Sequence, residues 1–157
     1  MKRIAVFPGS FDPFTIGHEH IVKRALLLFD EIIIAVGTNS TKSDFFSLES
    51  RIELIKQVFS KESKISISSY YGLTIDFCKQ TGSNYIVRGL RTSADFEYER
   101  AIAQVNKVLD NNIETIFLLT APEHSAITST LVREIIRHGG DAAKFLPVGI
   151  DINAFKY

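Results

Sequence analysis

The sequence predicts an α/β fold in which a doubly wound, five-stranded parallel sheet carries helices on both faces. Short apolar runs rich in branched residues alternate with longer stretches of helical period from end to end of the chain. Most of these runs are almost continuously hydrophobic, which is typical of strands buried on both faces. Right-handed crossovers between parallel strands then favour the doubly wound order. With 157 residues, the chain is expected to form one domain over residues 1–157.

Five segments have the pattern of strands. The third alternates Ile and Ser, so it is expected to be exposed or to lie at an edge of the sheet. The predicted strands are RIAVF (3–7), EIIIAVG (31–37), KISISSY (64–70), NYIVRG (84–89) and TIFLLT (115–120).

Helices are expected between these strands and after the last one. The third, at 74–82, ends at Gly82, which suits a left-handed C-terminal cap, and the fifth covers about 129–138 and stops at two glycines. In the fourth, at 93–109, charged residues such as Glu97, Glu99, Arg100 and Lys107 are expected to face solvent or ligand. The stripes expected to face the core are Ile21, Val22, Ala25, Leu26 and Phe29; Leu48, Ile52, Ile55 and Phe59; and Ala101, Ile102, Val105, Val108 and Leu109. The last residues, 146–157, are expected to be a short covering segment.

Composition and charge exclude several classes of protein. Lys plus Arg and Asp plus Glu number 18 each, so bulk electrostatics predict no nucleic-acid partner, and any bound anion must be held locally. The single Cys78 cannot form an internal disulfide, which suits a reducing compartment. The first apolar run is too short for a signal peptide or a membrane span. We therefore expect a cytoplasmic protein with no membrane partner.

Unusual residues follow four of the predicted strands. In a doubly wound sheet, ligands bind at the carboxyl ends of the strands, where the strand order reverses. The loops expected to meet there are PGSFDPFTIGH (8–18), GTNSTKSDFF (37–46), RGLRTSADFEYE (88–99) and TAPEHSAITSTLVRE (120–134).

The first of these loops has the features of a phosphate site. Gly9 and Gly17 allow close backbone approach, and the first amides of the following helix are unpaired donors at the positive end of its dipole. His18, in the first helical turn, can donate to a developing negative oxygen, whereas His20 points elsewhere around the helix. His18 could instead merely cap the helix, but the preceding glycine and the Ser10 hydroxyl favour a functional role. For Asp12, an Asx turn that fixes the loop is the preferred interpretation.

The other loops contribute cations and hydroxyls. Arg88 ends an apolar strand, where a guanidinium is costly to bury without an anion. Lys42 on its own would be an ordinary surface lysine. For Arg88 and Arg91, the alternative to anion binding is an ion pair with Asp95, Glu97 or Glu99. For Arg91 the ion pair is about as probable as anion binding, and for Arg88 it is less probable. The three hydroxyls of residues 128–130 exceed the one that a helix cap requires.

These features favour chemistry that positions phosphates. The chain has no G-x-G-x-x-G fingerprint, no P-loop, no supported Ser or Cys nucleophile and no Cys/His zinc spacing. Phosphoryl or nucleotidyl transfer remains, since there the protein mainly aligns two anions and stabilises spreading charge.

The stretches GSFDPFTIGH, RGLRTSADFEYE and ITSTLVRE, in this order and spacing, closely resemble the bacterial phosphopantetheine adenylyltransferases. This family belongs to the nucleotidyltransferase superfamily with an H-x-G-H or T-x-G-H element and a Rossmann-like fold. Thr15 at the first motif position favours the phosphopantetheine group, because nicotinamide-mononucleotide and glycerol-phosphate relatives typically carry His there. The resemblance covers essentially the whole chain.

The resemblance implies that ATP and 4'-phosphopantetheine give dephospho-coenzyme A and pyrophosphate, by direct in-line attack and with Mg²⁺ accompanying ATP. It also implies a homohexamer and feedback inhibition by coenzyme A. Catalytic roles fall to His18, Lys42 and Arg91, and contacts to phosphopantetheine fall to Ser10, Lys42, Thr74 and Arg88. The implied ATP site consists of Ser10, Phe11, His18, Gly89, Leu90, Arg91, Glu99, His124, Ser125, Ala126, Ile127, Thr128, Ser129 and Thr130, with no protein-held metal.

Some positions depart from the family pattern, and two alternatives stay open. Ser10 replaces the commoner Thr, His124 stands where another aromatic residue is frequent, and Thr74 stands where a larger apolar residue is common. One alternative is another nucleotidyltransferase, such as a cytidylyltransferase, against which Thr15 and the loop at 121–130 argue. The other is a non-catalytic nucleotide sensor, which would bind ATP without releasing pyrophosphate.

Overall fold

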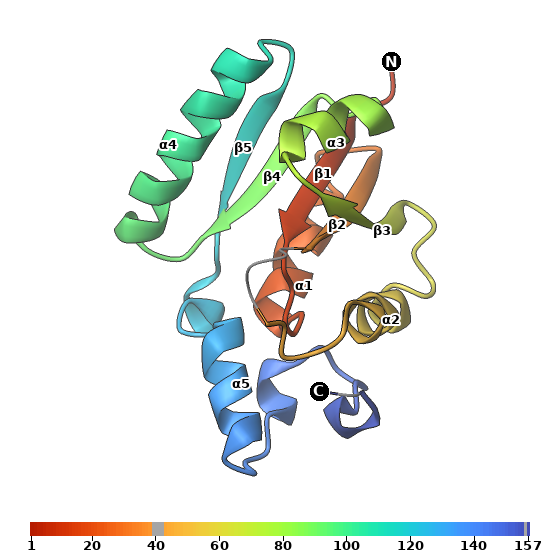
Figure 1. Cartoon of the computed structure of the whole chain (residues 1–157), viewed down its shortest axis with the longest axis vertical. Coiled ribbons are helices and arrows are strands. Elements are labelled where there is room, and N and C mark those ends of the chain that lie inside the picture. Colours follow the sequence, from red (N-terminus) through yellow and green to blue (C-terminus); the bar gives the residue numbers. More distant parts are fainter. Residues whose placement is uncertain (39–42, 156) are drawn as a thin grey trace.

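The computed structural model describes residues 1–38, 43–155 and 157. Within these residues, five parallel strands form one sheet in the order β3-β2-β1-β4-β5, with helices on both faces (Figure 1). The predicted doubly wound five-stranded sheet is therefore confirmed. The elements are β1 (Ile4–Gly9), α1 (Ile16–Ala25), β2 (Glu31–Thr38), α2 (Leu48–Val58), β3 (Ile65–Tyr71), α3 (Thr74–Thr81), β4 (Tyr85–Leu90), α4 (Ser93–Leu109), β5 (Glu114–Leu119), η1 (Pro122–His124), α5 (Ser129–Arg137), η2 (Ala143–Phe145) and η3 (Ile152–Ala154).

The strand pattern explains the order of the sheet. The central strands β1 and β2 are buried over four and five consecutive residues, as their continuous apolar runs predict. Strand β3, with its Ile/Ser alternation, pairs only with β2 and forms one edge, as expected. Strand order reverses at β1, whose neighbours are β2 and β4, so the carboxyl ends of β1 and β4 border the crevice where ligands bind in such sheets.

The two sheet faces have separate cores. Side chains of α1, α2, α5 and the C-terminal segment pack on one face, with Phe14, Ile34 and Leu146 at or near zero exposure. Helix α3 packs on the other face around Val6 and Cys78. It ends at Gly82, which adopts the predicted left-handed conformation and donates its N–H to the last helical carbonyls.

The orientation of α4 differs from the prediction. Its apolar stripe was expected to face the core, yet Ala101, Ile102, Val105, Val108 and Leu109 are all exposed, Val108 to 86%. The residue of this helix that is buried is Glu99, which the sequence placed toward solvent or ligand. The helix lies over β4 and β5 at the margin of the sheet, and no other described element covers its outer side (Figure 1). Helical period alone cannot tell a face covered by its own chain from one left bare.

No helix in the described part of the chain is long and apolar enough to cross a membrane.

Candidate active site

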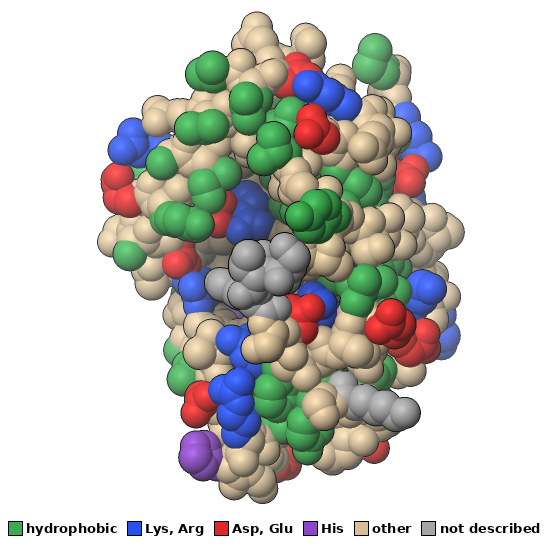
Figure 2. Space-filling model, viewed as in Figure 1, with side chains coloured by type: hydrophobic (Ala, Val, Ile, Leu, Met, Phe, Trp, Pro, Cys, Tyr) green, Lys and Arg blue, Asp and Glu red, His purple; other side chains and the backbone are tan. Residues whose placement is uncertain are grey.

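Two joined cavities lie at the carboxyl ends of the strands. The larger, of about 640 Å³, opens between β1, the ends of β2 and β3, and α4, and the smaller, of about 450 Å³, opens between the β1–α1 loop, β4 and the start of α5. Figure 2 shows a hollow in this region with basic side chains inside it. Both cavities are lined by Pro8, Gly9, Ser10, Arg88, Tyr98 and Glu99, so these residues form the boundary between them.

The T-x-G-H stretch forms a reciprocal cap at the start of α1. Thr15 is the N-cap residue, and its hydroxyl accepts the N–H of His18 while the N–H of Thr15 donates to Nδ1 of His18 at 3.0 Å. Because Nδ1 accepts a hydrogen bond, the neutral ring carries its proton on Nε2. His18 therefore caps the helix with one side of its ring, and it also lines the smaller cavity.

The surroundings of His18 keep its imidazole neutral. The ring lies among aromatic rings, with centroids 5.1 Å from Phe11 and 5.3 Å from Phe14. Burial of the ring, followed by the positive charges of Arg88 and Arg91, lowers the pKa of His18 from 6.5 to about 3. At neutral pH the imidazole is therefore an uncharged hydrogen-bond donor. Such a group suits a hydrogen bond to a phosphoryl oxygen better than it suits the removal of a proton.

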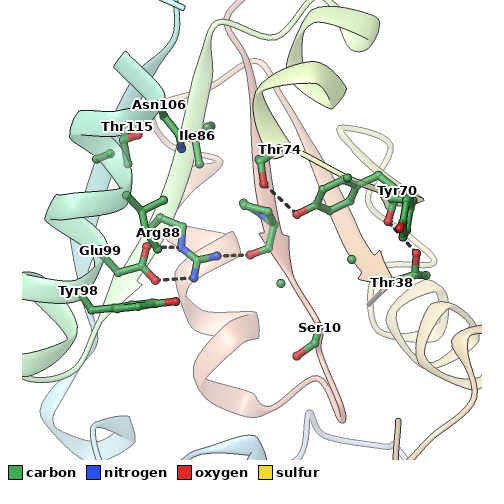
Figure 3. Close-up of a pocket in the computed structure, with 17 residues that line it drawn as sticks. Ser10, Thr38, Tyr70, Thr74, Ile86, Arg88, Tyr98, Glu99, Asn106 and Thr115 are labelled. Carbon is green, nitrogen blue, oxygen red and sulfur yellow. Dashed lines mark hydrogen bonds and ion pairs between the residues drawn. The ribbon is translucent and has the colours of Figure 1, made fainter. Parts of the chain in front are cut away.

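Arg88 is held rigidly where the two cavities meet. Its Nε and Nη2 donate to the two carboxylate oxygens of Glu99 at 2.9 and 2.6 Å, and Nη1 donates to the carbonyl of Pro8 (Figure 3). The ion pair that the sequence treated as the less probable alternative is thus present. A bidentate pair fixes the plane of the guanidinium, so its remaining N–H groups have a defined direction.

Arg91 and Arg133 add cations to the smaller cavity. Arg91 pairs with Asp95 through two bonds of 3.0 and 3.1 Å. Burial raises the pKa of Asp95, but these bonds and the charge of Arg91 outweigh it and hold the pKa below its usual value. Arg133 donates to the carbonyl of Asp12 at 2.7 Å and to the hydroxyl of Thr130 at 3.1 Å. Among the ion pairs of the described residues, none includes Arg133, so its charge is not neutralised by a carboxylate.

The three hydroxyls at 128–130 have three different partners, and that of Thr130 is the Arg133 guanidinium described above. Thr128 is the N-cap of α5 and accepts from the N–H of Leu131 at 3.0 Å, which confirms that one hydroxyl serves as a cap. Ser129 donates to the carbonyl of Pro13 at 2.8 Å and so ties the start of α5 to the β1–α1 loop. All three residues line the smaller cavity, at a helix end whose first amides are available to an anion.

Asp12 has a structural role, but not the expected one. Instead of closing an Asx turn, its carboxylate accepts the backbone N–H groups of Phe45 and Phe46 at 2.7 and 2.8 Å. The expectation was wrong because the partners lie 33 and 34 residues away, where local sequence gives no signal.

Most of the predicted site residues that are described lie in the cavities. Thr74 lines the larger one, with its hydroxyl 2.9 Å from that of Tyr70 (Figure 3). Leu90 is buried, and Leu90, Ser125 and Ala126 line neither cavity. Lys42 lies outside the described residues. The smaller cavity brings together Ser10, Phe11, His18, Arg88, Gly89, Arg91, Glu99, His124, Ile127, Thr128, Ser129 and Thr130.

Sequence reasoning did not name several residues of the site. Tyr98 reaches both cavities, Tyr70 and Asn106 line the larger one, and Arg133 lines the smaller one. Asn106 could have been found from its position seven residues after Glu99, which places both residues on one face of a helix. No such signal existed for Tyr98, because adjacent residues of a helix do not face each other. His20, set aside from the sequence, lines neither cavity and packs its ring against His124 at a centroid distance of 5.3 Å.

Comparison with protein families gives a match over most of the chain. A family model described as cytidylyltransferase-like matches residues 6–135. Among curated relatives, the phosphopantetheine adenylyltransferases of Flavobacterium psychrophilum, Bacteroides thetaiotaomicron and Cytophaga hutchinsonii are 54%, 48% and 46% identical. Each alignment covers 96% of this chain and at least 99% of the relative.

Comparison with solved structures gives the same fold at low sequence identity. A bifunctional NMN adenylyltransferase/ADP ribose pyrophosphatase from Francisella tularensis superposes with a TM-score of 0.72 at 18% identity, over 99% of this chain and 47% of its own. This chain thus spans about half of that protein. A putative nicotinate-nucleotide adenylyltransferase from Vibrio parahaemolyticus gives 0.69 at 19% identity, over 93% of this chain and 94% of its own.

Proposed function

This chain belongs to the phosphopantetheine adenylyltransferases, within the cytidylyltransferase-like family, and from that membership we propose how its two joined cavities carry out adenylyl transfer. The reaction joins the adenylyl group of ATP to 4'-phosphopantetheine and releases pyrophosphate, a step of coenzyme A biosynthesis. The observation that carries the assignment is the match to curated relatives at about half identity over nearly the whole chain. The family-model match over residues 6–135 spans every described residue of both cavities.

The two substrates occupy one cavity each. ATP fills the smaller cavity, with its phosphates against the first turns of α1 and α5 and its base toward His124 and Ile127. Phosphopantetheine fills the larger cavity, with its arm toward Thr74 and its phosphate at Arg88. Support comes from the boundary that the cavities share, because Ser10 and Arg88 lie where a phosphate of one substrate would meet the α-phosphate of the other.

His18 stabilises the transition state without taking a proton. The phosphate of phosphopantetheine is itself the nucleophile, and it attacks the α-phosphorus of ATP as the bond to pyrophosphate breaks, so no covalent enzyme intermediate forms. Nε2–H of the neutral imidazole donates to an α-phosphoryl oxygen as charge spreads over it. Lys42 and Arg91 share this stabilisation. Arg133, which is in none of the ion pairs among the described residues, faces the leaving phosphates.

Magnesium enters with ATP. The described residues contain no group of three or more His, Cys, Asp or Glu side chains placed to hold a metal ion, and the acids of the site, Glu99 and Asp95, are paired with arginines. Mg²⁺ is commonly bound through substrate phosphates with few protein ligands, so this side-chain set fits an ion carried by the triphosphate. A structure of the Francisella relative is described as complexed with AMP and a Mn ion.

Coenzyme A inhibition, assembly and location complete the proposal. Coenzyme A carries a pantetheine arm and an adenine nucleotide, so it can enter the joined cavities in place of the substrates. The bare apolar face of α4 supports assembly of several copies, a hexamer by family resemblance. The single buried cysteine supports a reducing, cytoplasmic location.

Pyrophosphate release tests the assignment. The purified chain is supplied with Mg-ATP and 4'-phosphopantetheine, and in parallel with ATP and nicotinamide mononucleotide, or CTP and glycerol 3-phosphate. Release is expected with phosphopantetheine only. Release with only another pair would overturn the substrate assignment but keep the chemistry, and nucleotide binding without release from any pair would favour the sensor.

A further inference from the structure

Arg51 of α2 is a buried arginine that lies outside both cavities. Its side chain is 1% exposed, and its Nη2 pairs with Asp44 at 2.6 Å. The other bonds are to backbone: Nε donates to the carbonyl of Phe46 at 3.2 Å, and Nη1 donates to the carbonyls of Ser10 at 2.7 Å and Gly37 at 3.5 Å. One guanidinium thus links the end of β2, the β1–α1 loop and the chain leading into α2.

The two bonds from Nη1 end on residues that line the larger cavity. Ser10 and Gly37 both line it, and Ser10 also lines the smaller one. Figure 3 shows Ser10 in the loop beyond the end of β1, facing the cavity opposite Arg88. Arg51 therefore holds the backbone of the cavity wall from behind and touches no space that a substrate fills.

A second contact runs in the opposite direction and closes the link. The carboxylate of Asp12, which is 7% exposed, accepts the N–H groups of Phe45 and Phe46. Asp12 of the β1–α1 loop thus binds the segment before α2, and Arg51 of α2 binds the loop. Asp12 and Arg51 together make up a buried clamp between these two segments.

The physical cost of this clamp indicates what it provides. The lost hydration of a buried guanidinium is compensated only if the geometry of its ion pair is good and further hydrogen bonds satisfy its donors. Apolar residues can often replace such groups without loss of stability. Here four hydrogen bonds engage four of the five N–H groups of the guanidinium, and three of these bonds go to carbonyls in separate segments. An apolar side chain could not hold the carbonyl of Ser10 in a fixed position, because it has no hydrogen-bond donor.

We propose that Arg51 is a positioning residue for adenylyl transfer: it fixes the backbone of Ser10, and through it the place where the two reacting phosphates meet. This inference rests on the proposed function and extends it to a residue that contacts neither substrate. A displacement of about 1 Å can cost on the order of 10²-fold in rate, so loosening the loop is expected to reduce turnover while the protein stays folded.

The test is a double-mutant cycle with Arg51→Lys and Ser10→Ala. Lysine keeps the charge for Asp44, but a single ammonium cannot also hold the carbonyls of Phe46 and Ser10 in the same planar arrangement. We expect kcat/KM for phosphopantetheine to fall roughly 10- to 100-fold in Arg51→Lys, mainly through kcat. In the Ser10→Ala background, the same change is expected to cost much less, because the hydroxyl that the positioned backbone carries is already gone.

Arg3→Lys is the matched control, since Arg3 also faces one aspartate, Asp30, but lies on the surface away from the cavities. It is expected to leave kcat/KM unchanged, and urea unfolding verifies that every variant is folded under assay conditions. An equal fold-loss in both backgrounds, or no loss, would overturn the positioning role. If Arg51→Lys does not fold, Asp44→Asn takes its place in the cycle and is judged by the same coupling. An inactive wild type would instead refute the proposed function.

Discussion

His18 caps α1 through Nδ1 and, in the proposed reaction, donates to the substrate through Nε2. Nδ1 accepts the N–H of Thr15, which leaves the proton on Nε2 for a ligand in the smaller cavity. Burial, followed by the charges of the neighbouring arginines, lowers the pKa of the ring, so the imidazole is a neutral donor beside two cations. Residue identity and local position were readable from the sequence, but the protonation state follows from the surroundings.

Replacement of His18 by alanine tests its role in the transition state. We expect kcat to fall by about 10²- to 10³-fold, the usual effect of losing one preorganised donor to a developing oxyanion, with little change in ATP affinity. His138→Ala, at a side chain 81% exposed, is the control and should be fully active. Steady-state kinetics and ATP titration give both quantities. A parallel loss of affinity and turnover would contradict the transition-state role.

The depressed pKa of His18 also predicts a pH dependence of stability. Between about pH 6.5 and pH 3 the unfolded chain protonates this residue while the folded chain does not, so acid favours unfolding. This residue therefore does not reduce the free energy of unfolding above about pH 6.5, and it reduces that free energy progressively as the pH falls below this value. Urea unfolding from pH 7 to 5 should therefore show a slope lower by up to about 1.4 kcal/mol per pH unit in His18→Gln than in the wild type. Identical slopes would show that the imidazole is not kept neutral.

At the scale of elements, the starts of α1 and α5 are built alike and face the same cavity. Thr15 caps one helix and Thr128 the other, and each leaves first-turn amides available to a phosphate. Ser129 joins the two helix starts through the carbonyl of Pro13. The proposed anion site therefore depends on two helix starts that are held together, rather than on one motif.

Thr15→Val tests whether the cap also aims the histidine. The isosteric change removes the hydroxyl beside His18 and should cost about 1 kcal/mol of stability, as for other N-caps. We expect kcat to fall roughly tenfold as well, because the ring loses part of its orientation. Ser47→Ala, which removes the N-cap of α2, should cost similar stability with unchanged kcat. Equal kinetics in the two variants would contradict an orienting role for Thr15.

At the scale of the whole molecule, α4 divides its surface between the site and an apolar exterior. Glu99 points inward to Arg88, while Val105 and Val108 are 59% and 86% exposed. Figure 2 shows hydrophobic side chains gathered where Figure 1 places this helix. A continuous exposed apolar face marks an interaction surface, and this one lies next to the larger cavity, which Ile102 of the same helix lines.

The double variant Val105→Asp and Val108→Asp tests assembly through this face. Both side chains are exposed in the single chain, so its own unfolding free energy should change by less than about 0.5 kcal/mol per site. Light scattering after size exclusion should show a smaller particle than the wild type. Leu27→Asp, at another exposed apolar residue beyond the end of α1, should keep the original mass. An unchanged mass in the double variant would refute assembly through α4.

The sequence by itself determined the sheet, its edge strand β3 and the position of the site at the carboxyl ends of the strands, and its resemblance to a known family supplied many of the side chains that line the site. The sheet and the position of the site follow from periodicity, caps and glycine positions, which act between residues close in the chain. Only the tertiary structure decided which way α4 turns, that Asp12 binds Phe45 and Phe46, and that Arg51 reaches Ser10. The partners in the last two contacts lie 33 to 41 residues apart, and such contacts form only once packing of separate elements brings their backbones together.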